Sequence, residues 1–313
     1  DVGICIAGGD AVHACAVGFR TFCAAIAVFA ALAYNRELVT GENMSDNTKN
    51  ILLKIQYDGT NFHGWQKQPN GRTVQGEVEH VLRFIAGYDV PVNGTSRTDA
   101  GVHALGQCAS FNWDNPLPTN KLANIMNRRF GAGGLGRSGL PGDIRVISAV
   151  EVPSDFHARF SCHGKTYKYV VDRSGDIFER NYVYQYGYEL DHEAMRVAAK
   201  AAVGTHDFAS FQTTGGIPRE TTVRTVTDIA ISDEGERTII RVTGDGFLYN
   251  MVRIIVGTLL EIGTGKRSAS DMEQIVADAT RSSAGFTAPP QGLYLEQIYF
   301  DDEFKRGGST CTR

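Results

Sequence analysis

The segment MVRIIVGTLL, residues 251–260, limits the possible folds of this chain more than any other. Together with its flanking residues it predicts a helix over 247–263, with apolar side chains on every side. A helix that is apolar all round is buried, so other elements must cover it completely. The chain has 313 residues, which leaves room for two domains and a sizeable core.

Arg253 is the exception inside this apolar segment. Burying a guanidinium is costly unless an acidic group pairs with it, and no acid lies three or four residues away on the same helix. One interpretation is that the side chain extends along the helix to reach solvent. The other is a partner from a distant loop.

Asp99 in TSRTDAGVHALGQ (95–107) is the candidate partner, because the small residues after it let other segments approach closely. On the residues alone, a lone aspartate in a turn is usually an Asx-turn or a helix cap, which is the alternative to a catalytic role for Asp99.

From Asn50 onward, strand patterns and helix patterns alternate. Apolar residues repeating at about 3.6 positions predict helices, and short alternating or continuous apolar runs predict strands. Asp233-Glu234-Gly235 indicates a hairpin turn, Thr73 is a candidate N-cap, and Gly204 a candidate helix end. We expect strands at 51–57, 103–113, 143–152, 165–171, 222–232, 238–245 and 292–300, and helices at 73–87, 120–130, 192–204, 247–263 and 268–279. Alternation combined with hairpins predicts an α+β fold with helices on one face of a sheet.

The formal net charge of −4 does not point to a nucleic-acid-binding protein, although a basic surface can still be local. The six cysteines include no CxxC pair of the kind that binds metal, and we interpret them as free thiols in a reducing compartment. The glycine-rich stretch 131–139 lacks the Lys-Ser/Thr of a phosphate-binding loop, so an exposed loop is expected there.

Residues 1–43 contrast with the rest of the chain. They include an apolar run at 22–34, which is shorter than the ~20 residues that span a bilayer. No basic segment precedes this run, whereas Asp1 and Asp10 do, unlike in a signal peptide. We favour a segment translated upstream of a start at Met44; the alternative is a targeting or membrane-associated segment. The tail from Arg306 is expected to be disordered.

Five segments, in a fixed order, carry a signature that extends over most of residues 50–300. They are YDGTNFHGWQKQPNGRTVQGEVE (57–79), SRTDAGVHA (96–104), DFHARFSCHGKTYKYVV (155–171), GDGFLYNMVRIIVGTLLEIGTGK (244–266) and TAPPQGLYLEQIYF (287–300). Together they closely resemble the TruA family of tRNA pseudouridine synthases. The chain departs from the family at Ser96, where many members have glycine, in a longer glycine-rich stretch, and in residues 1–43, which have no counterpart.

The resemblance implies an α+β fold of two similar domains, 49–153 and 154–303. Their mainly antiparallel sheets would join into one, with helices on one face and a catalytic cleft between the halves. Residues 1–48 would be an extension outside the fold, and 304–313 a disordered tail.

The resemblance also implies the activity: isomerisation of uridine to pseudouridine at positions 38 to 40 of the tRNA anticodon arm. No metal or other cofactor would be needed. The enzyme would be a cytoplasmic homodimer, without membrane association, and tRNA would be its partner.

Roles for individual residues follow from the same resemblance. Asp99 would be the nucleophile, attacking either C1′ of the ribose or the uracil ring, and Arg253 would pair with it. Tyr167 would contact the pyrimidine, with its ring stacked on the base and its phenol acting in proton transfer, so that Asp99, Tyr167 and Arg253 would form the catalytic set. Arg97 would fill the vacated base stack or hold a phosphate, and Leu293 would line the pocket. Candidates for a basic surface are Lys54, Lys67, Arg72, Arg128, Arg129, Lys165 and Lys168.

Two alternatives stay open at this stage. A tRNA-binding or tRNA-folding protein without catalysis would use the same fold and cleft, although binding alone does not need a buried carboxylate. A synthase with the same chemistry but another RNA substrate would also carry these segments, because surface shape selects the RNA.

Overall fold

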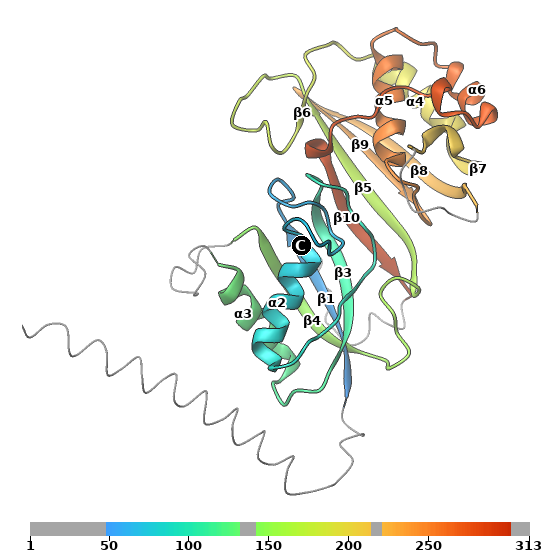
Figure 1. Cartoon of the computed structure of the whole chain (residues 1–313). Helices are drawn as coiled ribbons and strands as arrows, with labels where there is room; N and C mark the ends of the chain where they lie inside the picture. Colours follow the sequence, from blue (N-terminus) through green and yellow to red (C-terminus); the bar gives the residue numbers. More distant parts are fainter. Residues whose placement is uncertain (1–47, 132–141, 214–220, 302–313) are drawn as a thin grey trace, which may run out of the picture. The chain divides into compact units, whose positions relative to one another are not determined.

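The fold is built on one mixed β-sheet, which the computed structural model shows in Figure 1. The structure describes residues 48–131, 142–213 and 221–301. The strand order is β4-β1-β3-β10-β5-β9-β8-β7, with β2 beside β3 and β6 beside β5. The strands are β1 (Lys49–Tyr57), β2 (Asn93–Gly94), β3 (His103–Trp113), β4 (Ile144–Val152), β5 (Cys162–Asp172), β6 (Tyr184–Gln185), β7 (Gly204–Asp207), β8 (Val223–Glu234), β9 (Arg237–Gly244) and β10 (Leu293–Phe300). The helices are α2 (Val74–Ala86), α3 (Thr119–Phe130), α4 (His192–Ala201), α5 (Met251–Gly263) and α6 (Asp271–Asp278).

Strand β10 joins the part of the sheet made by the first half of the chain to the part made by the second. β1 pairs antiparallel with β3 and β4, and β5, β9, β8 and β7 follow one another as antiparallel neighbours. β10 is antiparallel to β5 but parallel to β3, where Leu295 lies beside Ala104. The expected α+β class with one joined sheet is confirmed, while a division into two similar domains stays a prediction.

The helices pack on one face of this sheet. The register aligns Ala104, Leu295, Tyr167 and Val242 in a row across β3, β10, β5 and β9, and all four are buried in the main hydrophobic cluster. Apolar residues of all five helices belong to the same cluster. Figure 1 shows α2 and α3 near β1 and β4, and α4, α5 and α6 near β8 and β9. The side chains of this row therefore point toward the helices.

Helix α2 has the ends that its sequence predicts. The Thr73 hydroxyl accepts a hydrogen bond from the Gly76 amide at 3.3 Å, which satisfies one of the unpaired donors of the first turn. Gly87 ends the helix with a φ of 82°, in the left-handed region that glycine adopts without strain.

The prediction that α4 extends to Gly204 is wrong. The helix ends at Ala201, because Ala202 and Val203 donate hydrogen bonds to carbonyls three residues back and tighten the last turn. Gly204 begins β7 instead, with a φ of 126°. The sequence did not reveal β2, β6 or β7, because runs of two to four residues are too short to show a period.

Helix α5 is buried as predicted, and only Arg253 and Glu261 among its 13 residues are partly exposed. Its predicted start at Phe247 is wrong. Asn250 has a φ of 61°, a left-handed conformation that breaks the helix, so α5 begins at Met251. This turn leaves residues 247–250 free to line the site described below.

The predictions for residues 1–43, for the tail and for nearly all of the glycine-rich stretch lie outside the described residues. Within the described ranges, no helix is long and apolar enough to cross a membrane. Two of the six cysteines fall in these ranges, and both, the buried Cys108 and the half-buried Cys162, are free thiols.

Candidate active site

The loop between β2 and β3 carries Asp99 and is tied firmly to β3. The amide and the hydroxyl of Thr95 both donate to the Cys108 carbonyl, at 2.8 and 3.0 Å. The buried Gln107 side chain accepts from the Ser96 amide at 3.3 Å and donates to the Ser96 carbonyl at 2.6 Å. These bonds satisfy the backbone at the start of the loop and fix its path.

The segment after β1 packs against the other side of this loop. The Trp65 amide donates to the Thr98 carbonyl at 3.1 Å, and a Cβ on Gly64 would lie only 2.5 Å from that carbonyl oxygen. The Gly101 amide donates to the Phe62 carbonyl at 3.3 Å. Gly101 itself has a φ of 77°, and a Cβ there would lie 3.1 Å from Pro290 Cγ, so this small residue permits the close approach that the sequence predicted.

The carboxylate of Asp99 faces the guanidinium of Arg253, with Oδ2 3.5 Å from Nη1. Their side chains are 26% and 15% exposed, so Arg253 does not extend to solvent. Arg253 Nε donates to the Ala288 carbonyl at 2.6 Å, and Nη1 donates to Asn250 Oδ1 at 2.7 Å. These two bonds hold the planar guanidinium in one orientation toward Asp99.

Two opposing effects act on the pKa of Asp99. Burial raises it above the ordinary 3.8, while the charge of Arg253 and its hydrogen bond lower it. Burial prevails, so the carboxylate ionises less readily than an exposed aspartate. Arg253 limits this upward shift of the Asp99 pKa but does not abolish it.

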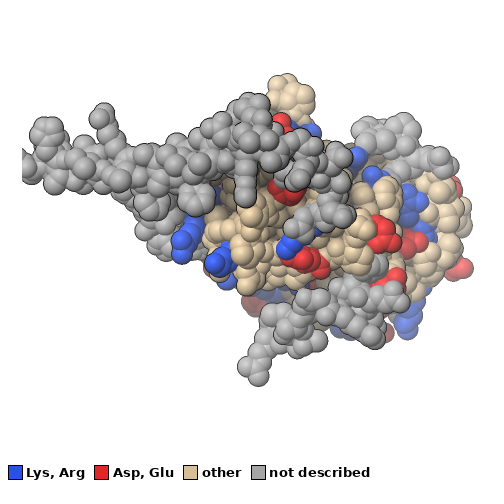
Figure 2. Space-filling model, turned by 90° about the horizontal axis from the view of Figure 1, so that it is seen from below, with Lys and Arg blue, Asp and Glu red and all other residues tan. Residues whose placement is uncertain are grey.

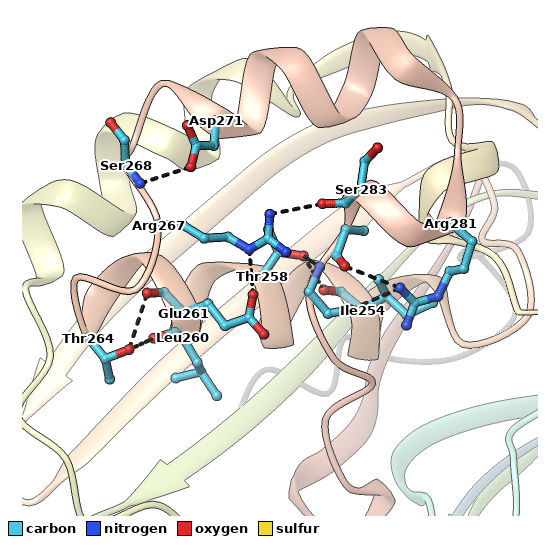
Figure 3. Close-up of polar contacts among 12 residues, drawn as sticks. Ile254, Thr258, Leu260, Glu261, Thr264, Arg267, Ser268, Asp271, Arg281 and Ser283 are labelled. Carbon is cyan, nitrogen blue, oxygen red and sulfur yellow. Dashed lines mark hydrogen bonds and ion pairs between the residues drawn. The ribbon is translucent and has the colours of Figure 1, made fainter.

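A polar network fastens the segment after α6 to α5, and thereby positions Ala288 (Figure 3). Arg267 is at its centre: Nε donates to Glu261 Oε2 at 2.5 Å, and Nη1 donates to the Ser283 carbonyl at 2.9 Å. Glu261 belongs to α5, so the network connects the helix directly to the segment that returns across it.

The same segment then runs close to the backbone of α5. The Gly285 amide donates to Thr258 Oγ1 at 2.9 Å, and a Cβ on Gly257 would lie 1.8 Å from the Phe286 carbonyl oxygen. Only glycine fits there. Ala288 lies two residues after Phe286. The close contact between Gly257 and Phe286 therefore helps to place the Ala288 carbonyl, which accepts the hydrogen bond from Arg253.

Tyr167, on β5, lies in the same site and is 6% exposed. Its hydroxyl is 2.9 Å from Ser96 Oγ, and the Phe247 ring meets its ring edge-on at a centroid distance of 5.4 Å. Burial raises the pKa of the Tyr167 phenol, which therefore keeps its proton at neutral pH. Ser96, noted in the sequence only as a departure from the family, is thus a direct partner of Tyr167.

All five predicted site residues line one cleft of about 940 Å³: Arg97, Asp99, Tyr167, Arg253 and Leu293. Arg97 is exposed and Leu293 is buried. In the part of the chain that the structure describes, no group of three or more His, Cys, Asp or Glu side chains is arranged to hold a metal ion.

The cleft is cationic although the chain is acidic overall. Among its described lining residues are five basic side chains, Arg97, Arg159, Lys165, Arg224 and Arg253, against the single carboxylate of Asp99. On the face shown in Figure 2, by contrast, acidic and basic side chains lie interspersed. Positive charge lining a concave surface attracts polyanions far more strongly than the net charge suggests.

Of the seven basic candidates from the sequence, only Lys165 lines the cleft. Lys67 is paired with Glu79 at 2.9 Å. Lys168 follows Tyr167 on β5 and so points to the opposite face of the sheet. The sequence missed Arg159 and Arg224, because no local pattern separates a cleft arginine from a solvated one.

Comparison with known proteins identifies the family. The family described as tRNA pseudouridine synthase matches residues 54–161 and 198–301, more than half of the chain. The chain belongs to the TruA family of tRNA pseudouridine synthases. The matched ranges contain Asp99 and Arg253, while Tyr167 lies between them.

Curated TruA relatives match at close to full length. The tRNA pseudouridine synthase A of Halalkalibacterium halodurans is 49% identical over 78% of this chain and 90% of its own. That of Acetivibrio thermocellus is 43% identical over 80% of this chain and 100% of its own, as is tRNA pseudouridine synthase A 2 of Clostridium perfringens. Among solved structures, a chain of a Cbf5-Nop10-Gar1 complex aligns with 80% of this chain and 50% of its own, at 13% identity and a TM-score of 0.32.

Membership of the TruA family makes this protein an isomerase that forms pseudouridine in tRNA. The alternative of a tRNA-binding protein without catalysis is thereby set aside.

Proposed function

We propose that this TruA-family enzyme modifies positions 38 to 40 of the tRNA anticodon arm, with Asp99 as the nucleophile. One observation carries the proposal: a carboxylate lies 3.5 Å from the partly buried Arg253 in a cleft whose other charged lining residues are cationic. The cations attract the phosphate backbone, and among the described lining residues Asp99 supplies the carboxylate that can attack.

The reaction exchanges one bond to the ribose for another. The bond from N1 to C1′ breaks, the base turns, a bond from C5 to C1′ forms, and the hydrogen of C5 is replaced by one on N1. No electrons are gained or lost. In this proposal Asp99 forms a transient covalent bond, either to C1′ or to the uracil ring, and a carboxylate is a competent nucleophile for both.

Tyr167 is proposed to contact the uracil with its ring. Its phenol keeps its proton because burial raises its pKa, and it has a hydrogen-bond partner in Ser96. A neutral phenol donates hydrogen bonds and is a weak base. The role that fits these facts is to position the base through the ring and a hydrogen bond from the neutral phenol, rather than to abstract a proton.

Arg97 and Leu293 are proposed to assist extrusion of the target uridine. A base stacked in the anticodon arm must leave the stack before Asp99 can reach it. The exposed Arg97, two residues from Asp99, would occupy the vacated space or hold a phosphate, and the buried Leu293 would form an apolar wall for the uracil.

The decisive experiment replaces Asp99 by asparagine. Asp99→Asn should abolish release of tritium from tRNA labelled with [5-³H]uridine, because an amide oxygen is a far weaker nucleophile than a carboxylate. Binding of tRNA should survive, since phosphate contacts supply most of the affinity. Asp89→Asn is the matched control, because its carboxylate is 83% exposed and does not line the cleft. Undiminished tritium release by Asp99→Asn would remove Asp99 from the mechanism.

We further propose that the enzyme acts in the cytoplasm as a homodimer of two-domain subunits, 49–153 and 154–303, with residues 1–48 and 304–313 outside the fold. The full-length match of relatives to about four-fifths of this chain supports a dispensable N-terminal segment. A chain shortened to begin at Met44 should therefore modify tRNA at the wild-type rate. Its mass in sedimentation should be that of two subunits. Loss of activity on shortening would make the segment part of the enzyme.

A further inference from the structure

Phe160 is an apolar ring held out into the cleft. It is 78% exposed, and among the large apolar side chains of the described residues only Phe178, at 82%, is more exposed. Phe160 lines the cleft that holds Asp99, whereas Phe178 does not. An exposed ring in a functional cleft is available to bind a partner.

The turn that carries Phe160 is rigid. The amides of Phe160 and Ser161 both donate to the His157 carbonyl, at 3.0 and 2.8 Å, and the His157 amide donates to Ser161 Oγ at 3.1 Å. The Ala158 amide donates to Ser110 Oγ on β3 at 3.0 Å, and Ala158 is fully buried. The ring is therefore presented in a fixed place, so little conformational freedom is lost when a partner binds.

Two neighbours complete the surface around the ring. The His157 ring lies 4.5 Å from the Phe160 ring between centroids, and the Arg159 amide donates to His157 Nδ1 at 3.1 Å, which fixes the imidazole. The Arg159 guanidinium carbon is 5.7 Å from the centroid of Phe160. An aromatic face beside an arginine can contact a planar base and its phosphate together.

The charge of the cleft determines which partner fits. Its lining holds five cations and one carboxylate, which favours a polyanion over an apolar peptide. Proteins that bind unpaired nucleotides combine positive grooves with aromatic rings on which bases stack. Tyr249, another exposed ring at 43%, lines the same cleft.

We propose that Phe160 is a stacking platform for an unpaired base of the tRNA, and that Arg159 holds an adjacent phosphate. This base is distinct from the target uridine. Tyr167, which is 6% exposed, forms the deep part of the cleft near Asp99, whereas Phe160 is at its open rim. The inference rests on the proposed function, because it takes the tRNA as the occupant of the cleft.

The test compares Phe160→Ala, Phe160→Trp and Phe178→Ala in the full chain, with a tRNA transcript as the probe. Stacking on one ring contributes enough that Phe160→Ala should raise the Kd about 5- to 150-fold. Phe160→Trp should bind as the wild type does, since indole retains the stacking face. Phe178→Ala is the matched control, because it removes an equally exposed ring outside the cleft. Melting curves of all variants should coincide.

Salt dependence separates stacking from charge. Phe160→Ala should weaken binding at every salt concentration and leave the slope of log Kd against log salt unchanged, because phenylalanine neutralises no phosphate. Arg159→Ala should reduce that slope by about one phosphate contact. A merely structural role for Phe160 would change both quantities, through misplacement of Arg159, and would overturn the proposal.

A Phe160→Ala enzyme that binds tRNA as tightly as Phe178→Ala does would overturn it as well. Failure of this inference is distinguishable from failure of the proposed function. In the first case the wild type still forms pseudouridine in the anticodon arm and Asp99→Asn does not. In the second, the wild type modifies other positions or Asp99→Asn stays active.

Discussion

At the scale of single residues, the surroundings of Asp99 on balance oppose its charge. Burial raises its pKa above 3.8 in the folded protein, so the folded state favours the protonated carboxyl relative to the unfolded chain. The charged form, which the proposed nucleophilic attack requires, therefore costs stability at neutral pH. Function and stability conflict at this one side chain.

The first prediction concerns the stability of Asp99→Asn. Asparagine resembles the protonated acid, so the variant avoids the cost of a buried carboxylate and should melt at a higher temperature than the wild type near neutral pH. The pH-dependent part of this difference should shrink as pH falls through the raised pKa of Asp99, and should be gone below 3.8. Thermal melting of both proteins across this range measures it. A lower melting temperature for the variant at neutral pH would mean that pairing with Arg253 outweighs burial.

The second prediction concerns Arg253, whose charge and hydrogen bond lower the pKa of Asp99. Without them the pKa rises further, so Arg253→Leu should shift the acidic limb of the kcat/KM profile to higher pH and slow the reaction at neutral pH. Arg253→Lys should have a smaller effect on the limb, because it keeps the charge. Arg253→Lys should still lose activity, because a single ammonium group cannot reproduce the two hydrogen bonds that the guanidinium donates to Ala288 and Asn250. Rates of tritium release measured against pH test both variants. If the acidic limb of the kcat/KM profile of Arg253→Leu stays where it is in the wild type, the pairing is contradicted.

The pair of Asp99 and Arg253 was predictable from the sequence for a physical reason. A cation inside an apolar helix needs a partner, and a loop with small residues is a place where one can approach. The contact between Ser96 and Tyr167 was not predictable, because it joins two segments far apart in the chain through hydroxyls that fit many settings. Arg159 shows the same limit, since only the folded turn directs it into the cleft.

At the scale of elements, α5 and the segment that crosses it act as one unit. Gly257 permits the crossing, because a Cβ there would lie 1.8 Å from the Phe286 carbonyl oxygen. The crossing places the Ala288 carbonyl where it accepts from Arg253. Packing in the second half of the chain thus affects the position of Arg253, and through it Asp99, by way of one backbone carbonyl.

The third prediction follows from this crossing. Gly257→Ala should lower the melting temperature, because backbone must move to admit the methyl group, and overpacking of this kind typically costs about 1–3 kcal/mol. It should also lower kcat/KM, because Ala288 moves with the segment and Arg253 loses its anchor. Gly187→Ala is the control, since a Cβ there has no neighbour within 4 Å. A variant that loses stability but retains full activity would show that the crossing does not position Arg253.

Element ends were harder to predict than elements. The apolar period identified α5 and its burial, yet the helix begins four residues later than predicted. The reason is Asn250, whose left-handed turn brings its side chain to Arg253. Periodicity continues through such a turn, so only the backbone conformation reveals where the helix stops. The displaced residues, 247–250, are cleft-lining ones.

At the scale of the whole molecule, the charge of the cleft is opposite in sign to the net charge of the chain. The net charge is −4, but the cleft gathers five basic side chains. Arg253 faces Asp99, and the other basic side chains among the described lining residues, Arg97, Arg159, Lys165 and Arg224, are the candidates for phosphate contacts. A basic cleft in a chain that is acidic overall favours binding of RNA at the cleft rather than over the whole surface.

The fourth prediction is that tRNA binding is salt-sensitive despite the acidic total. Each phosphate contact by one of these four side chains releases counterions, so log K should fall against log salt with a slope on the order of −3. Titration of labelled tRNA at several salt concentrations gives the slope. Affinity that is flat from low to moderate salt would exclude phosphate contacts as the main source of binding.

The parallel pairing of β3 with β10 also affects folding during synthesis of the chain. The ribosome makes β1, β3 and the Asp99 loop well before α5 and β10. Until β10 arrives, the part of β3 that it will pair with is an open edge, able to capture a strand from another nascent chain. Pairing between segments so distant in sequence forms slowly. The half-made protein is therefore the stage most exposed to aggregation, and on a crowded polysome a chaperone would have its greatest effect before β10 is synthesised.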